Sequence, residues 1–236
     1  MFEYCTSITN LPALSVDTMQ VGCYRVMYKN CTSLIAPPVL SSTVLADYCY
    51  SEMFMGCTSL SNTPVLPATT LALHCYSQMF MGCTSLVNVT TLPSTTMQRG
   101  CYTYMFRGCT ALYAPPALPA TSLEDSCYRG MFEGCTLITT APTLPATSFV
   151  RPDTSPNWAN HWYYYCYKDM FKDCTSLNNI KAMFTSMPDR QVYEVTDNWL
   201  QNVAATGVFT KNSSATWTLN GPSGVPFDWT VQTASS

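Results

Sequence analysis

The stretch CYSEMFMGCTSLSNTPVLPATTLALH, residues 49–74, is followed directly by CYSQMFMGCTSLVNVTTLPSTTMQRG at 75–100 and CYTYMFRGCTALYAPPALPATSLEDS at 101–126. The paired cysteines of these units recur from Cys5 to Cys135 in alternating steps of 18 and 8 residues, which gives a period of 26 residues. A unit of this length cannot bury its own apolar side chains. The units are therefore predicted to stack as the coils of a solenoid, each covering the next.

Apolar residues recur at fixed positions of every unit, and these positions are predicted to face the interior. The three columns include Leu60, Leu86 and Leu112; Leu66, Leu92 and Leu118; and Leu71, Met97 and Leu123.

The segment between the paired cysteines has a helix-like pattern. Cys49 and Met53 share one face at a spacing of four, and Tyr50 and Phe54 share the adjoining face. We therefore expect one short helix per coil. Its end is predicted at the residue before the second cysteine, because the residue types found there tolerate positive φ: Asn30, Gly56, Gly82, Gly108, Gly134 and Asp173.

The segment 58–66 and its counterparts are predicted to form short parallel strands. A proline stands at one column in most units (Pro12, Pro38, Pro64, Pro116 and Pro142), and proline cannot donate to a strand ladder. The fold class expected is an α/β repeat solenoid, similar to leucine-rich repeats, with strands on one face and helices on the other. Residues 1–183 would form about seven coils with an insertion at 150–162, and residues 184–236, with a helix at 193–204, a C-terminal cap.

The repeat MFxGCTSLxxxPxLPAT resembles the BspA-like leucine-rich repeats of the Treponema pallidum type, found in surface proteins of Bacteroides-type bacteria and in proteins of their phages. The resemblance covers about residues 1–183, and the segments 207–211 and 225–231 are similar to the closing part of such proteins. It implies a curved solenoid used for adhesion or recognition rather than catalysis. It also implies an extracellular or cell-surface location or, alternatively, a phage virion.

The chain begins inside a repeat, since Met1–Cys5 aligns with MFxGC. An uncapped coil would expose a core cross-section, so neighbouring repeats or a second copy are expected to associate there. The interpretation that this is a piece of a longer chain stands beside that of a natural start with a frayed first coil.

The thirteen cysteines are expected to be buried thiols. Two cysteines separated by eight residues would lie ~12 Å apart in a helix, beyond disulfide reach. Disulfides between adjacent coils and a metal site stay open as alternatives. No C-x-x-C pair occurs, and the two histidines, His74 and His161, fall in different coils, so a zinc site lacks its usual ligands.

Charge and motifs exclude several functions. The net charge of −3 and a charged fraction of only 11% do not favour nucleic-acid binding. No stretch is long and apolar enough to span a membrane. No G-x-S-x-G, phosphate-binding glycine loop or H-E-x-x-H motif is present, so neither catalysis nor a cofactor is predicted.

The candidate ligand-binding residues lie mainly in the insertion, because a segment that breaks a repeat often forms a binding loop. Aromatic rings beside Asn, Asp and Arg suit sugars and protein hot spots. The predicted contacts are Arg151, Asp153, Trp158, Asn160, His161, Trp162 and Tyr164, together with Tyr113 on the strand face. Packing of the tryptophans on their own coil is the alternative.

Three functional hypotheses follow. The first is a non-enzymatic module that binds a glycan or protein through the strand face and the loop at 150–165. The second is a structural spacer or fibre component without a ligand. The third, an ice-binding surface built on the threonine pairs 69–70 and 95–96, is disfavoured because these pairs are expected to border prolines and helix starts.

Overall fold

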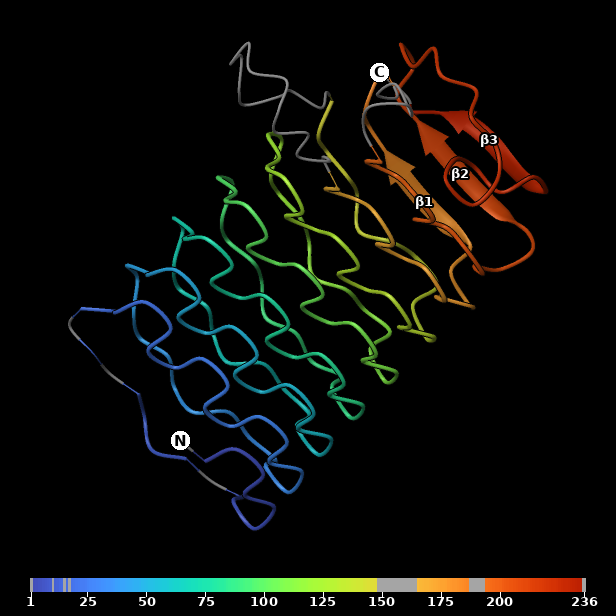
Figure 1. Ribbon diagram of the computed structural model, residues 1–236. Coiled ribbons are helices and arrows are strands. Elements are labelled where there is room, and N and C mark those ends of the chain that lie inside the picture. The colour runs from blue at the N-terminus through green and yellow to red at the C-terminus, as the bar shows by residue number, and fades with distance from the viewer. Residues whose placement is uncertain are drawn as a thin grey trace.

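The computed structural model describes residues 2–9, 11–14, 16, 18–147, 165–186 and 194–234. The chain winds into a stack of coils that lie side by side along one axis (Figure 1). The described residues contain three strands: β1 (Asn179–Ala182), β2 (Gly207–Lys211) and β3 (Trp229–Thr233). They form one parallel sheet in the order β1-β2-β3, and isolated bridges such as Thr140 to Asn179 connect β1 to the preceding coil.

The predicted α/β class, with one short helix and one short strand per coil, is wrong. In the described coils up to residue 147, the segment 58–66 and its counterparts form only isolated bridges, such as Asn62 to Asn88. No helix occurs in the part of the chain that the structure describes, neither between the paired cysteines nor within 194–204. The backbone angles give the reason, because φ is positive at every fourth residue: 57° at Tyr48, 57° at Glu52 and 73° at Gly56. A right-handed helix requires negative φ throughout.

The segment between the cysteines is instead a series of overlapping turns, which we call the turn ribbon (48–57 and its counterparts). Alternate N–H groups point in two directions. The N–H of Cys49 donates to the carbonyl of Ala46 three residues back, whereas the N–H of Tyr50 donates to the carbonyl of Cys75 in the next coil. Positive φ falls at the third position of every second turn, as a type II turn requires. Backbone hydrogen bonds that a helix would close internally therefore connect the coils.

The turn ribbon explains why the sequence resembled a helix. Its residues repeat every four positions, and over nine residues this is hard to distinguish from the period of 3.6 of a helix. The prediction of positive φ before the second cysteine is confirmed at Asn30, Gly56, Gly82, Gly108, Gly134 and Asp173. The further positive values at Tyr48 and Glu52 fall on residue types that rarely adopt them.

Peptide groups of the turn ribbon form continuous hydrogen-bonded chains along the stack. Tyr24 N–H donates to Cys49 C=O at 2.9 Å, and Tyr50 N–H, from the same peptide unit as that carbonyl, donates to Cys75 at 3.0 Å. The series continues with Tyr76 and Cys101. Because every dipole in such a chain points the same way, each bond polarises the next, as in a helix.

The core columns predicted from the sequence are confirmed. Leu60, Leu86 and Leu112 have no exposed surface. Beside them run two ladders of stacked rings. The ring centroids of Phe54 and Phe80 are 5.6 Å apart, and the tyrosine ladder has similar spacings of 5.7–6.2 Å between Tyr24, Tyr50, Tyr76, Tyr102, Tyr128 and Tyr167.

The prediction of buried thiols is confirmed for eleven cysteines, and all thirteen are free. Cys23 is exposed and Cys5 is partly buried. The second thiol of each unit donates to a carbonyl of the preceding coil: Cys57 Sγ to Tyr28 O at 3.0 Å and Cys83 Sγ to Phe54 O at 3.1 Å. Burial raises the pKa of Cys57 to about 12, so the thiol keeps the proton that it donates.

Residues 194–234 continue the winding. Phe171 N–H donates to Trp199 C=O at 3.0 Å, as its counterparts do in earlier coils. The Trp199 ring is buried, and its Nε1 donates to Gly224 O at 2.8 Å. The domain boundary at 183/184 stays a prediction. Among the described residues there is no helix with the length and apolar character needed to cross a membrane.

Candidate ligand-binding surface

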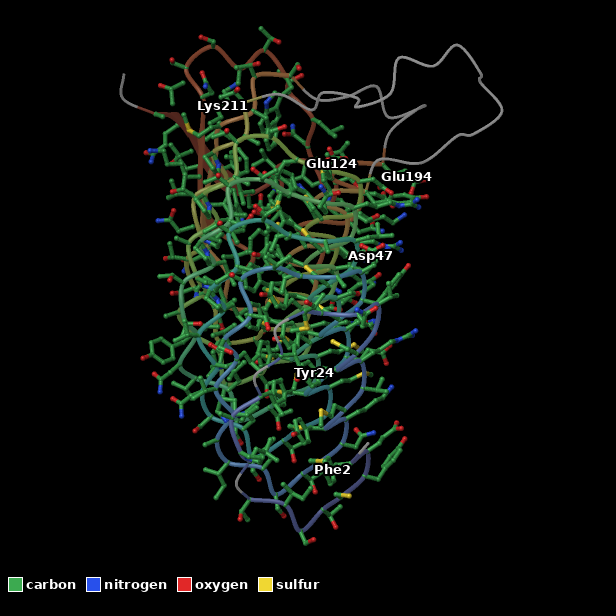
Figure 2. The ribbon with its side chains drawn as sticks, turned by 90° about the vertical axis from the view of Figure 1, so that its left-hand side faces the viewer. Phe2, Tyr24, Asp47, Glu124, Glu194 and Lys211 are labelled. Atoms are coloured by element: carbon green, nitrogen blue, oxygen red, sulfur yellow. The ribbon has the colours of Figure 1, made fainter. Side chains whose placement is uncertain are left out.

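Between residues 18 and 147, charged side chains are confined to one part of each coil, whereas β1 and β2 carry Lys181 and Lys211. Five segments carry no charged residue, and we call their exposed side chains the neutral surface: 32–44, 58–70, 84–96, 110–122 and 136–147. All charges between residues 18 and 147 belong to the turn ribbons and the residues that flank them. Figure 2 shows Asp47, Glu124 and Glu194 along the same side of the stack. The neutral surface therefore extends over several coils without interruption by charge.

An asparagine ladder lies on the neutral surface. Asn62 and Asn88 are bridge partners in adjacent coils, and Asn88 Nδ2 donates to Asn62 Oδ1 at 2.8 Å. Asn62 Nδ2 in turn donates to Ser61 Oγ at 2.8 Å. These bonds hold exposed amides in one orientation. Carboxamides held in this way present both donors and acceptors to a ligand at a low entropic cost.

Exposed hydroxyl groups form a second feature of this surface. Thr70, Thr96 and Ser122 are bridge partners in successive coils, and Thr69, Thr95 and Thr121 stand next to them. The prediction that helices start at these threonine pairs, which disfavoured an ice-binding surface, is wrong. No helix starts there in the described residues, and the second residue of each pair lies on a parallel bridge.

Large exposed side chains on the neutral surface supply apolar contact area. Tyr113 is 58% exposed, and Val39 and Val65, which occupy one column in adjacent coils, are 68% and 67% exposed. The Tyr113 hydroxyl makes no hydrogen bond to the described residues. An exposed aromatic ring with a free hydroxyl can both stack on a ligand and form a hydrogen bond with it.

The charged side differs because many of its ionic groups are paired between coils. Glu52 accepts from Arg25 at 3.3 Å and from Lys29 at 2.7 Å, and Arg99 Nε lies 3.1 Å from Asp125. Burial opposes ionisation of Glu52, but its bonds to Lys29 and Arg25 prevail and lower its pKa. Such surface pairs contribute little stability, but they occupy the groups that a charged ligand would need.

The sequence placed most of its candidate residues in the insertion. Arg151, Asp153, Trp158, Asn160, His161, Trp162 and Tyr164 lie outside the described residues, so their role stays a prediction. Tyr113 is exposed, as its predicted role needs. Val39 and Val65 were not predicted as contacts, although their recurrence at one column in a charge-free segment was a usable signal.

The described residues offer no grouping that suits a metal ion, since no three His, Cys, Asp or Glu side chains come together there. His74 stacks on Tyr48, with ring centroids 5.0 Å apart, and burial together with Arg99 lowers its pKa. Comparison of the chain with protein-family models, with curated proteins and with solved structures finds no match. The resemblance to BspA-like repeats thus stays a prediction from the repeat motif.

Proposed function

We propose that the protein is a non-enzymatic recognition module that binds an uncharged glycan or an uncharged protein surface through the neutral surface. The observation that carries the proposal is the separation of charge. Ionisable groups are concentrated on the turn-ribbon side, whereas amides, hydroxyls, Tyr113 and exposed valines occupy the other segments.

The chemistry of this surface favours neutral polar ligands. An uncharged ligand loses little hydration energy when it meets hydroxyl and amide groups, and it avoids the desolvation of buried charges. Because the coils repeat at a fixed spacing, a weak contact made at one coil can recur at the next. The binding free energies of these contacts then add without a further entropic cost of ordering the ligand. A surface of this kind binds by summing many modest contacts around an aromatic anchor.

The insertion is the proposed second contact. Trp158, Trp162 and their neighbours follow the segment 136–147 in the chain, and their aromatic rings would add a second set of contacts to the ligand. The alternative, a spacer or fibre component without a ligand, predicts that substitutions on the neutral surface leave binding of every kind unchanged.

The test is a glycan array together with pull-downs of candidate surface proteins, followed by calorimetry on the strongest ligand. We expect Tyr113→Ala to lower the affinity by about tenfold or more, since aromatic anchors dominate binding energy. The double variant Trp158→Ala and Trp162→Ala is expected to weaken the same ligand.

The matched control is Arg25→Ala with Lys29→Ala on the charged side, which should leave the affinity unchanged. Melting curves of all variants show whether the fold is intact. If the control weakens binding while Tyr113→Ala has no effect, the neutral surface is not the binding site. If no ligand is found and all variants behave alike, the spacer function is favoured.

A further inference from the structure

A stack of alternating cations and tyrosine rings lies outside the neutral surface, on the charged side. Arg107 and Arg129 flank the ring of Tyr104, with guanidinium carbons 5.2 and 5.6 Å from its centroid. Arg129 and Lys168 likewise flank Tyr165, at 5.0 and 4.7 Å. We call these five residues the cation–tyrosine stack.

The two ends of the stack are neutralised, but its centre is not. Arg107 lies 3.1 Å from Glu133, and Lys168 contacts both Glu194 and Asp197. Arg129 has no acidic partner within the described part of the chain, and its Nε is buried without a hydrogen bond there. A guanidinium that is partly withdrawn from water and lacks an anion is unusual, because such charges are normally paired.

The carboxylates four residues before and four residues after Arg129 are engaged elsewhere. Asp125 holds Arg99 through Oδ2, and its Oδ1 accepts from the backbone N–H of Tyr165 at 3.2 Å. Glu133 is only 8% exposed and forms an ion pair with Arg107.

The backbone at Gly130 makes room for the cation–tyrosine stack. Its φ is +55°, and a side chain there would overlap the ring of Tyr104. The missing side chain lets Tyr104 lie across the next coil, where it contacts Arg129. The guanidinium thus lies between two rings.

We propose that Arg129 is a binding site for a carboxylate of an acidic ligand, such as the uronic acid of a glycan. Its faces are covered by tyrosine rings and its Nε is buried, which leaves the two terminal nitrogens as donors. Two parallel N–H groups match the two oxygens of a planar carboxylate. This site would add an acidic contact to a protein whose neutral surface has none.

The experiment is a titration of the full chain with sodium glucuronate, followed by NMR of the arginine Nε–Hε signals and by the melting temperature. We expect a saturable shift of the Arg129 signal and a rise in melting temperature with glucuronate, and neither with glucose. Sodium phosphate and sodium sulfate at equal ionic strength are the competing arms. Stronger binding of either would overturn the assignment to a carboxylate.

Two variants complete the test. Arg129→Gln should abolish the glucuronate effect on melting, whereas the matched variant Arg25→Gln should keep it. Arg129→Lys preserves the charge and the ring contacts but loses the paired donors, so we expect at least tenfold weaker binding. Equal glucuronate effects in the wild type and in Arg129→Gln, or no shift of the Arg129 signal in the wild type, would show that the site does not exist. None of these outcomes depends on the neutral surface.

Discussion

The second cysteine of each unit has a specific role at the residue scale. Its carbonyl partner already accepts a backbone hydrogen bond: Tyr28 O accepts from Cys31 N–H at 3.1 Å and also from Cys57 Sγ at 3.0 Å. Cysteine suits the site because it is a small apolar side chain that still offers a weak donor. This accounts for thiols in a stack that has no disulfide among them and no metal site in the described residues.

The buried thiols predict a loss of stability at alkaline pH. Burial raises the pKa of Cys49 and Cys57 from 9.0 to about 12, and that of Cys83 in the same direction. The unfolded chain therefore loses these protons at a lower pH than the folded chain. The stability they contribute is complete below about pH 9 and is lost as pH rises towards 12.

We expect the melting temperature to be level between pH 7 and about 8.5 and to fall from about pH 9. Circular dichroism melts over this range measure it, and the ultraviolet absorption of thiolate should appear together with unfolding rather than before it. Ionisation of most thiols in a chain that is still folded would contradict the prediction.

At the scale of the element, the turn ribbon depends on positive φ at fixed positions. Gly82 has φ of +73°, and a side chain there would meet only ordinary contacts, with Gly56 Cα at 3.8 Å. Gly130 has φ of +55°, and a side chain there would also overlap the Tyr104 ring. Comparing alanine substitutions at these two glycines therefore separates the energetic cost of backbone strain from that of steric overlap.

We expect Gly82→Ala to lower the free energy of unfolding by about 1–2 kcal/mol, the cost of left-handed backbone in an alanine. Gly130→Ala should cost more, because Tyr104 must move as well. Gly82→Asn is the control. It should cost less than Gly82→Ala, because asparagine tolerates this region and Asn30 already occupies the column with φ of 58°. Urea unfolding with an unchanged m-value measures all three. Equal losses at Gly82 and Gly130 would show that the ring contact is unimportant.

The contrast between core and ribbon shows what the sequence could predict. Leu60 and Cys57 recur at fixed positions, and recurrence alone identifies an interior column. The turn ribbon was not predicted because a four-residue period over nine residues also matches a short helix. In addition, Tyr48 and Glu52 adopt positive φ values, which their residue types do not indicate. The neutral surface was visible as missing charge. The cation–tyrosine stack could not be predicted from the sequence, because it brings together residues from successive coils that an insertion separates in the chain.

At the scale of the whole molecule, the stack is held together by contacts between neighbouring coils. Hydrogen bonds in residues 22–134 join each turn ribbon to the next one, and the ring ladders repeat the same connection. Stability is then close to a sum of coil and interface contributions. Each interface is nearly equivalent, so a coil can be removed if the register of its neighbours is kept.

We therefore expect deletion of residues 76–101, one period of 26 residues, to leave a folded protein, because Cys75 is then followed by Tyr102 and every column stays in register. The melting temperature should fall by several degrees, since one coil and one interface are lost, while the circular dichroism spectrum keeps its shape. The control deletion of 78–101 removes two residues fewer. It displaces each later side chain by two positions, so that ring no longer stacks on ring, and it should unfold the later coils or melt far lower. Similar stability of the two deletions would mean that the ladders of rings and peptide groups do not hold the stack together.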